Sequence, residues 1–226
     1  MNEAYEYFEN KDCIDKFENF REHLLEYNKK CNLTSISDKK EVYIKHFLDS
    51  ILPEELFPVN SNVIEIGSGG GFPSIPLKIV RGDLNFTLVE STGKKCVYLE
   101  ETIQKLGLEG VKVLNIRAED GGRKQNLREK YDIAEARAVA SLNTLCEYCM
   151  PFVKVGGLFI AYKSDAGEEL ENAKNAILTL GGELEKVYSY SLPENSGSRT
   201  AIVIKKIKST PEKYPRGRGL ERRKPL

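Results

Sequence analysis

The chain has 226 residues, of which 34 are basic and 34 acidic, so its formal net charge is zero. Hydrophobic residues make up 40% and charged residues 30%, a globular composition that excludes a disordered chain, a collagen and a coiled coil. No apolar run approaches the ~18 residues of a membrane span, and residues 1–6 lack the features of a secretion signal. The five cysteines, an odd number, argue against a disulfide framework. The sequence predicts a soluble cytoplasmic protein.

Two amphipathic helices are expected before residue 60. In residues 12–33 apolar side chains recur every three or four positions, and residues 39–52 form a second helical stretch that Pro53 ends. No strand-like run precedes residue 60, so residues 1–60 are predicted to form a helical N-terminal extension. Residues 28–34 between the helices either cap the first helix or close over a ligand. His46 on the second helix either faces a cleft or is a hydrogen-bonded structural histidine.

Residues 61–208 alternate between short β-prone runs and helical stretches. The first five runs leave room for a crossover helix after each, which predicts a Rossmann-like α/β domain with a mostly parallel, seven-stranded sheet. The last two runs are separated by too few residues for a helix, so they are expected to form an antiparallel hairpin at one edge. The seven runs are 63–66, 86–89, 111–114, 133–136, 158–162, 186–191 and 200–204.

Charge is distributed unevenly along the chain. Residues 205–226 hold nine basic and two acidic residues, a net charge of +7 that the rest of the chain balances with −7. Prolines and glycines prevent a long helix there, so residues 209–226 are predicted to form a basic C-terminal tail that contacts RNA and whose removal spares cofactor affinity. The alternative is a merely solvated terminus. The candidate RNA-binding residues are Lys213, Arg216, Arg218, Arg222 and Arg223, with Tyr214 as a base-stacking ring.

A glycine-rich loop follows the first predicted strand. Gly67, Gly69 and Gly71 stand between that strand and a helix, where glycines let a ligand approach the backbone closely. Glu90 ends the next strand, where an acidic side chain can bind ribose hydroxyls. Together these features predict a nucleoside cofactor.

The residues around this loop favour S-adenosylmethionine over NAD or ATP. Pro73 and Pro76 remove N–H groups that a pyrophosphate would use at the helix start, and Phe72 replaces the third glycine of the dinucleotide fingerprint. Glu65 adds a carboxylate that would repel a diphosphate but complements an ammonium or sulfonium group.

Cys146 and Cys149 form a Cys-x-x-Cys pair without a second pair at metal-ligand spacing. On a predicted helix they fall on the apolar face with Leu142, Leu145 and Phe152, so core packing is expected and no metal site.

Several motifs in chain order resemble the RsmG (GidB) family of 16S rRNA guanine-N7 methyltransferases. Residues 27–34 are similar to a Trp-Asn-(x)-Asn-Leu-Thr stretch of that family, with Tyr27 in place of tryptophan, and residues 45–50 to its second helix. Residues 67–77 resemble its cofactor loop. Residues 90–95, 117–119, 137–140, 214–216 and 225–226 follow in family order.

This resemblance implies a class I fold that uses S-adenosylmethionine, with 16S rRNA of the small subunit as substrate. A monomeric protein is expected. It places Gly67 and Phe72 at the methionine side, Glu90 at the ribose, and Ala118 with Glu119 at the adenine. Guanine N7 carries a lone pair and no proton, so no general base is required. Arg137, at the cofactor and substrate edge, is the candidate to orient the guanine; its alternative is a structural ion pair.

Two other classes of function stay open. A methyltransferase could act on a small molecule or protein, although the basic tail favours RNA. A non-catalytic ribosome-binding protein could keep the fold, although the intact glycine loop with Glu90 argues against it. An NAD-linked oxidoreductase is disfavoured by Pro73 and Pro76.

Overall fold

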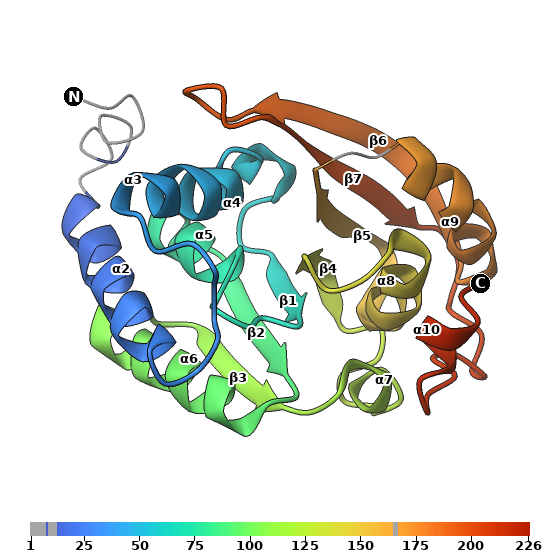
Figure 1. Ribbon diagram of the computed structural model, residues 1–226. Helices are drawn as coiled ribbons and strands as arrows, with labels where there is room; N and C mark the ends of the chain where they lie inside the picture. Colours follow the sequence, from blue (N-terminus) through green and yellow to red (C-terminus); the bar gives the residue numbers. More distant parts are fainter. Residues whose placement is uncertain (1–7, 9–12, 165–166) are drawn as a thin grey trace.

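The computed structural model describes Phe8, residues 13–164 and residues 167–226, and shows one central sheet between two layers of helices (Figure 1). The seven strands have the order β3-β2-β1-β4-β5-β7-β6. They are β1 (Asn62–Ile66), β2 (Asn85–Glu90), β3 (Val111–Asn115), β4 (Tyr131–Arg137), β5 (Val153–Lys163), β6 (Gly182–Ser191) and β7 (Ser198–Lys206).

Strand pairing confirms the mostly parallel sheet. The pairs β1–β2, β2–β3, β1–β4 and β4–β5 are parallel, and β7 is antiparallel to both β5 and β6. The predicted hairpin therefore forms at one edge. Its second strand, β7, is inserted between β5 and β6, an order that the sequence did not reveal.

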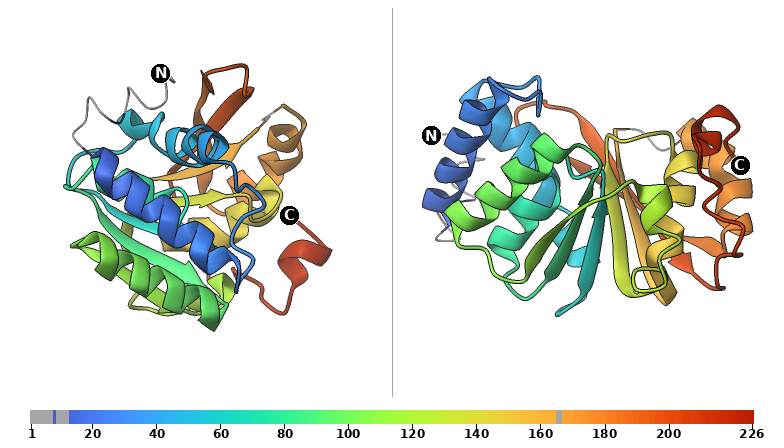
Figure 2. Two further views of the ribbon diagram at one scale, coloured as in Figure 1. Left: turned by 60° about the vertical axis from the view of Figure 1, so that its left-hand side comes forward. Right: turned by 90° about the horizontal axis from the view of Figure 1, so that it is seen from below.

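The helices lie on both sides of the sheet, as Figure 2 shows in its view from below. One side carries α2 (Ile14–Asn28), α3 (Lys39–Val42), a π-helical segment (Tyr43–Leu48), α4 (Asp49–Ile51), α5 (Ser74–Val80) and α6 (Gly93–Leu106). The other carries α7 (Ala118–Gly121), α8 (Leu142–Cys149), α9 (Gly167–Thr179) and α10 (Leu220–Arg223). Short 3-10 turns occupy Glu54–Leu56 and Met150–Phe152. No helix in the described ranges is both long and apolar enough to span a membrane.

The N-terminal helices share their core with the sheet. Phe17 and Phe20 of α2 and Phe47 are fully buried, and the ring of Phe20 lies 5.4 Å from that of Phe72 in the glycine loop. The predicted extension 1–60 thus packs on the sheet in its described part; residues 1–7 and 9–12 lie outside the described residues. The predicted helix over 39–52 is continuous, but its middle is π-helical and contains His46.

The second core, on the other side of the sheet, contains both cysteines of the Cys-x-x-Cys pair. Cys146 and Cys149 lie on α8, are fully buried and carry free thiols. Burial raises the pKa of both thiols, as expected for apolar packing. The prediction of core cysteines is confirmed.

Candidate functional site

A pocket of about 290 Å³ opens at the carboxyl ends of four adjacent parallel strands. Ligands of open α/β sheets bind in this position, because the strand order reverses there and the loops diverge. In this sheet the reversal lies between β1 and β4. The lining residues are Ile66, Gly67, Val89, Ser91, Ile116, Arg117, Ala118, Glu119, Val139, Tyr148, Gly219 and Arg222.

Gly67, the first glycine of the loop, lines this pocket. Gly67 has a φ of +74°, and a Cβ at this position would stand 2.7 Å from Val139 Cγ2. Gly71, with a φ of +86°, would place a Cβ 2.7 Å from Ile75 Cγ1. L-residues with side chains rarely adopt such backbone angles, so the loop keeps its shape only with glycine at these positions.

Glu90 holds the loop from the end of β2. Its carboxylate accepts the backbone N–H of Gly69 at 3.1 Å and that of Thr92 at 2.7 Å, and the side chain is 7% exposed. A carboxylate has about four acceptor positions, so two remain for other donors. Glu90 therefore lies at the end of β2 and anchors Gly69, and its contact with a ribose stays a prediction.

The chemistry of the pocket fits an adenosine compound better than a dinucleotide. Gly67, Ala118 and Glu119 line it, as predicted for a nucleoside cofactor. Helix α5, which follows the loop, begins at Ser74 after Pro73 and has Pro76 in its first turn. Neither proline has an N–H for a phosphate, so this helix start offers few donors for a pyrophosphate.

Glu65 is placed differently from the prediction of a carboxylate facing a cationic group. Its side chain is fully buried below the loop, opposite Glu135 in the register of β1 and β4. Among the described residues, neither carboxyl oxygen of Glu65 has a hydrogen-bond partner. Burial raises the pKa of Glu65 to about 7, and burial together with Glu65 raises the pKa of Glu135 well above its usual range. The pair therefore retains at least one proton near neutral pH, because two adjacent buried acids resist ionising together.

Arg137 lines a second pocket, of about 410 Å³, and Phe72 packs against two of the lining residues. The Arg137 guanidinium donates to Asp49 Oδ2 at 3.1 Å and stands 5.0 Å from the centre of the Phe72 ring. Phe72 stacks on His46 with ring centres 4.5 Å apart. The second pocket is lined by Lys45, His46, Asp49, Arg137, Ala138, Tyr162, Lys163, Ser164, Glu169 and Arg199.

The His46 ring is held neutral by its partners. Arg137 Nη2 lies 3.3 Å from Nδ1, and because a guanidinium only donates, Nδ1 is the acceptor and Nε2 carries the proton. Nε2 then donates to Thr34 Oγ1 at 2.6 Å. Burial, with the positive charge of Arg137, lowers the pKa of His46 to about 3. His46 is therefore both hydrogen-bonded and at a pocket, so the two alternatives for it coincide.

Residues 28–34 form the turn that ends α2, the first of the two alternatives; closure over a ligand stays a prediction. Asn28 Oδ1 accepts the N–H groups of Leu33 and Thr34 at 2.8 and 3.0 Å, which closes the turn after α2. The same turn lies against the loop, since a Cβ on Gly70 would be 3.6 Å from the carbonyl oxygen of Leu33.

Two residues of the second pocket, Asp49 and Arg199, were not predicted as site residues from the sequence. Asp49 is buried and accepts from Arg137 and, at 2.9 Å, from the Tyr190 hydroxyl, while Arg199 Nε lies 3.6 Å away. An acid within an apolar helix was the only available signal for Asp49. Arg199 comes from β7, whose insertion beside β5 brings it to this site.

The basic C-terminal segment folds back onto the body. The Tyr214 ring is 6% exposed, so it is not available for stacking on a base, and Arg216 is bound to Glu147. Arg222 lines the first pocket. Lys213, Arg218 and Arg223 are exposed and remain candidates for contact with phosphates.

The neutral His46 predicts a specific pH dependence of stability. The folded protein holds this ring unprotonated to about pH 3, whereas the unfolded chain protonates it near 6.5. The contribution of His46 to the free energy of unfolding is therefore fully present above pH 6.5 and is lost as the pH falls from 6.5 toward 3. At pH 5 the free energy of unfolding should be lower by about 2 kcal/mol from this group. Denaturant unfolding at pH 7.5 and pH 5 measures it. The His46→Gln variant should lose less free energy of unfolding over this interval than the unchanged protein, and an equal loss would contradict the assignment.

Comparison with known proteins agrees with this geometry. Residues 13–197 match the model of a family described as rRNA small subunit methyltransferase G. A Lactobacillus johnsonii protein named ribosomal RNA small subunit methyltransferase G is 47% identical over 216 residues, 93% of this chain and 90% of the relative. The protein of the same name from Bacillus subtilis is 46% identical over 216 residues, 94% of this chain and 90% of the relative.

Solved structures share the fold at low identity. A SAM-dependent O-methyltransferase from Thermotoga maritima has a TM-score of 0.55 at 15% identity and covers 83% of this chain and 73% of its own. TYW2 from M. jannaschii in complex with AdoMet has a TM-score of 0.54 at 16% identity and covers 70% of this chain and 77% of its own. The predicted class I architecture is confirmed.

Proposed function

The chain belongs to the rRNA small subunit methyltransferase G family, and from this membership and its site we propose that it transfers a methyl group from S-adenosylmethionine to N7 of a guanine in 16S rRNA. The observation that carries the proposal is the pocket at the strand ends, which is lined by Gly67 of the glycine loop and by Ala118 and Glu119. It lies next to a second pocket with several cationic side chains that suits an RNA base.

The residues around the first pocket are assigned to the cofactor. Gly67, Gly69 and Gly71 allow its close approach, Glu90 binds ribose hydroxyls, and Ala118 with Glu119 flank the adenine. The cofactor supplies a methyl group on a positively charged sulfur. Phe72, at the end of the loop, packs against His46 and Arg137 of the second pocket and is assigned to the methionine side of the cofactor. Glu65 is a buried carboxyl near the end of β1, and we assign it no direct contact with the cofactor.

The second pocket is assigned to the acceptor guanine. The lone pair of guanine N7 would form the new bond to the methyl carbon. The carbon–sulfur bond of the cofactor would break at the same time, and the electrons of that bond would stay on the sulfur. No proton is removed, so the protein must orient the base rather than act as a general base. Arg137, fixed by Asp49 and His46, presents a donor that can bind guanine O6.

The exposed basic residues of the C-terminal segment are assigned to the RNA backbone. Changing Lys213, Arg218 and Arg223 together to Gln should lower the affinity for RNA and reduce the slope of log affinity against log salt by up to about 2–3. Filter binding at several salt concentrations measures this slope. A matched triple variant at Lys112, Lys130 and Lys154, which are exposed at the amino ends of their strands, should leave the slope unchanged. If the two triple variants behave alike, the C-terminal residues do not contact RNA.

The RNA target is a base outside regular helices. Guanine N7 lies in the major groove, which is deep and narrow in A-form RNA, so a base in a duplex is inaccessible to the second pocket. The protein acts as a cytoplasmic monomer on the small subunit or its rRNA.

Methyl-labelled S-adenosylmethionine and small ribosomal subunits that lack the modification test the proposal. After incubation with the protein, reductive strand cleavage should map one N7-methylguanine in 16S rRNA. Label at another position or in another molecule would show that the acceptor differs from the one proposed. No transfer with intact cofactor binding would favour a non-catalytic ribosome-binding protein.

A further inference from the structure

The C-terminal segment, residues 210–224, forms one wall of the cofactor pocket. Gly219 and Arg222 line that pocket together with residues that follow β3, namely Ala118 and Glu119. Helix α10 of this segment packs on α8, as Figures 1 and 2 show. The segment that the sequence marked as a free basic tail therefore completes a site built by the sheet.

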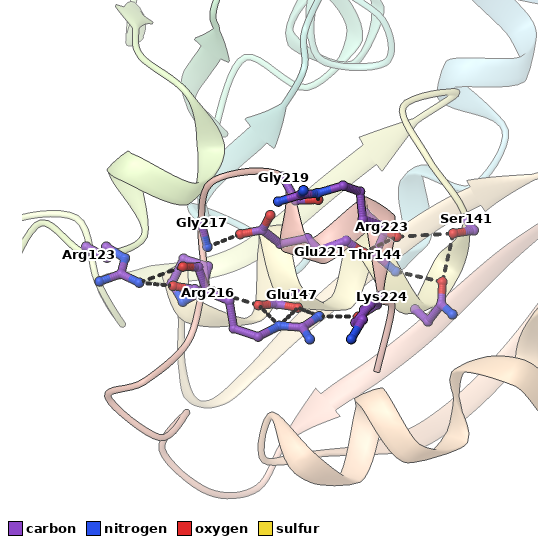
Figure 3. Close-up of polar contacts among 12 residues, drawn as sticks. Arg123, Ser141, Thr144, Glu147, Arg216, Gly217, Gly219, Glu221, Arg223 and Lys224 are labelled. Carbon is purple, nitrogen blue, oxygen red and sulfur yellow. Dashed lines mark hydrogen bonds and ion pairs between the residues drawn. The ribbon is translucent and has the colours of Figure 1, made fainter.

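One ion pair fastens the segment to α8. Arg216 Nε lies 3.0 Å from Glu147 Oε1 and Arg216 Nη2 lies 2.7 Å from Oε2, while the Arg216 backbone N–H donates to Oε1 at 2.7 Å (Figure 3). Glu147 is 1% exposed. This geometry is bidentate, the strongest form of the arginine–carboxylate contact, and it fixes the direction of the chain at Arg216.

Further contacts hold the segment on both sides of Arg216. Glu221 of α10 is fully buried, its carboxylate accepts the backbone N–H of Gly217, and its carbonyl oxygen accepts from the Thr144 hydroxyl at 2.9 Å (Figure 3). Arg123 donates to the carbonyl oxygen of Pro215 at 2.6 Å. The position of α10 over the pocket is thus determined by side chains outside the pocket.

Neighbouring arginines of α10 have different surroundings. Arg222 lies near the Tyr148 phenol; burial raises the pKa of Tyr148, and the Arg222 guanidinium opposes that rise. Arg223, the next residue, does not line the pocket and donates to the carbonyl oxygens of Gly219 and Arg218 on its own segment. Only Arg222 of these two faces the cofactor site.

We propose that Arg222 contacts the adenosine part of the cofactor and that the Arg216–Glu147 pair is the positioning contact that holds it there. A guanidinium is planar and stacks on aromatic rings, and its place beside Ala118 and Glu119 is where the adenine is assigned. This inference rests on the proposed function, since it concerns the same cofactor. It moves Arg222 from the predicted RNA-binding set to the cofactor site.

Calorimetric titration with S-adenosylhomocysteine and with 5′-methylthioadenosine tests the inference on the full chain. Arg222→Gln should weaken the binding of both compounds roughly tenfold, because both contain the adenosine. Arg223→Gln, the matched control, should leave both affinities within twofold. Both residues are exposed, so neither change should lower the melting temperature appreciably.

The positioning pair is tested by the split between KM and kcat. Glu147→Gln should raise the KM for S-adenosylmethionine several-fold and leave kcat at saturating cofactor nearly unchanged, whereas a purely structural defect would lower the amount of active protein and hence kcat.

The outcomes separate the two proposals. Equal affinities of Arg222→Gln and the unchanged protein, or a loss confined to RNA binding, would overturn the inference while leaving the proposed function intact. If the unchanged protein bound neither adenosine compound, both would fail.

Discussion

Replacing Gly67 by alanine is expected to weaken binding of S-adenosylhomocysteine by roughly 100-fold or more and to remove methyl transfer with it. The added Cβ would stand 2.7 Å from Val139 Cγ2, and a φ of +74° is strained for alanine. Either Val139 or the loop must move, and both line the pocket. Calorimetric titration with S-adenosylhomocysteine measures the affinity directly.

Gly82→Ala is the matched control for this substitution. A Cβ on Gly82 would meet nothing within 4 Å, and its φ lies outside the positive range. This variant should bind the cofactor product normally and melt at or near the temperature of the unchanged protein. If Gly67→Ala also bound normally, the glycine loop would be a simple turn and the cofactor assignment would be wrong.

Replacing Arg137 by glutamine is expected to lower kcat by on the order of 10²-fold while cofactor affinity changes little. The guanidinium binds Asp49 and His46 together at the second pocket, and glutamine cannot make both contacts in the same geometry. Its loss also leaves the buried Asp49 carboxylate with Tyr190 and the more distant Arg199, so stability should fall. Single-turnover methyl transfer and cofactor titration separate the two effects.

Arg81→Gln distinguishes catalysis from stability. Arg81 is buried to a similar extent as Arg137. It binds Asp83 and the carbonyl oxygens of Glu54 and Phe57, and none of these partners lines either pocket. It should lose stability but keep kcat. Should Arg137→Gln lose only stability and retain kcat, Arg137 would be a structural ion pair, the alternative that the sequence left open.

The sequence determined most of the fold because the signals concerned are local. All seven strands were predicted from short β-prone runs, and the crossover helices from the spacing between those runs. The glycine loop was equally readable, because glycines, prolines and Glu90 lie within 25 residues at the ends of two successive strands. Such features depend on backbone sterics and on the burial pattern of residues that are close in the sequence. The local amino-acid sequence is therefore sufficient to predict them.

Only the tertiary structure decided which charged residues meet. The sequence placed Arg216 in an RNA-binding tail, but it pairs with Glu147, 69 residues away. The family resemblance placed Arg137, at the end of β4, at the substrate edge, yet its partner Asp49 is 88 residues away. Glu65 loses its expected role because β4 sets Glu135 opposite it. The ionisation and the accessibility of a side chain depend on the burial and charge that distant segments bring, and no local pattern encodes these quantities.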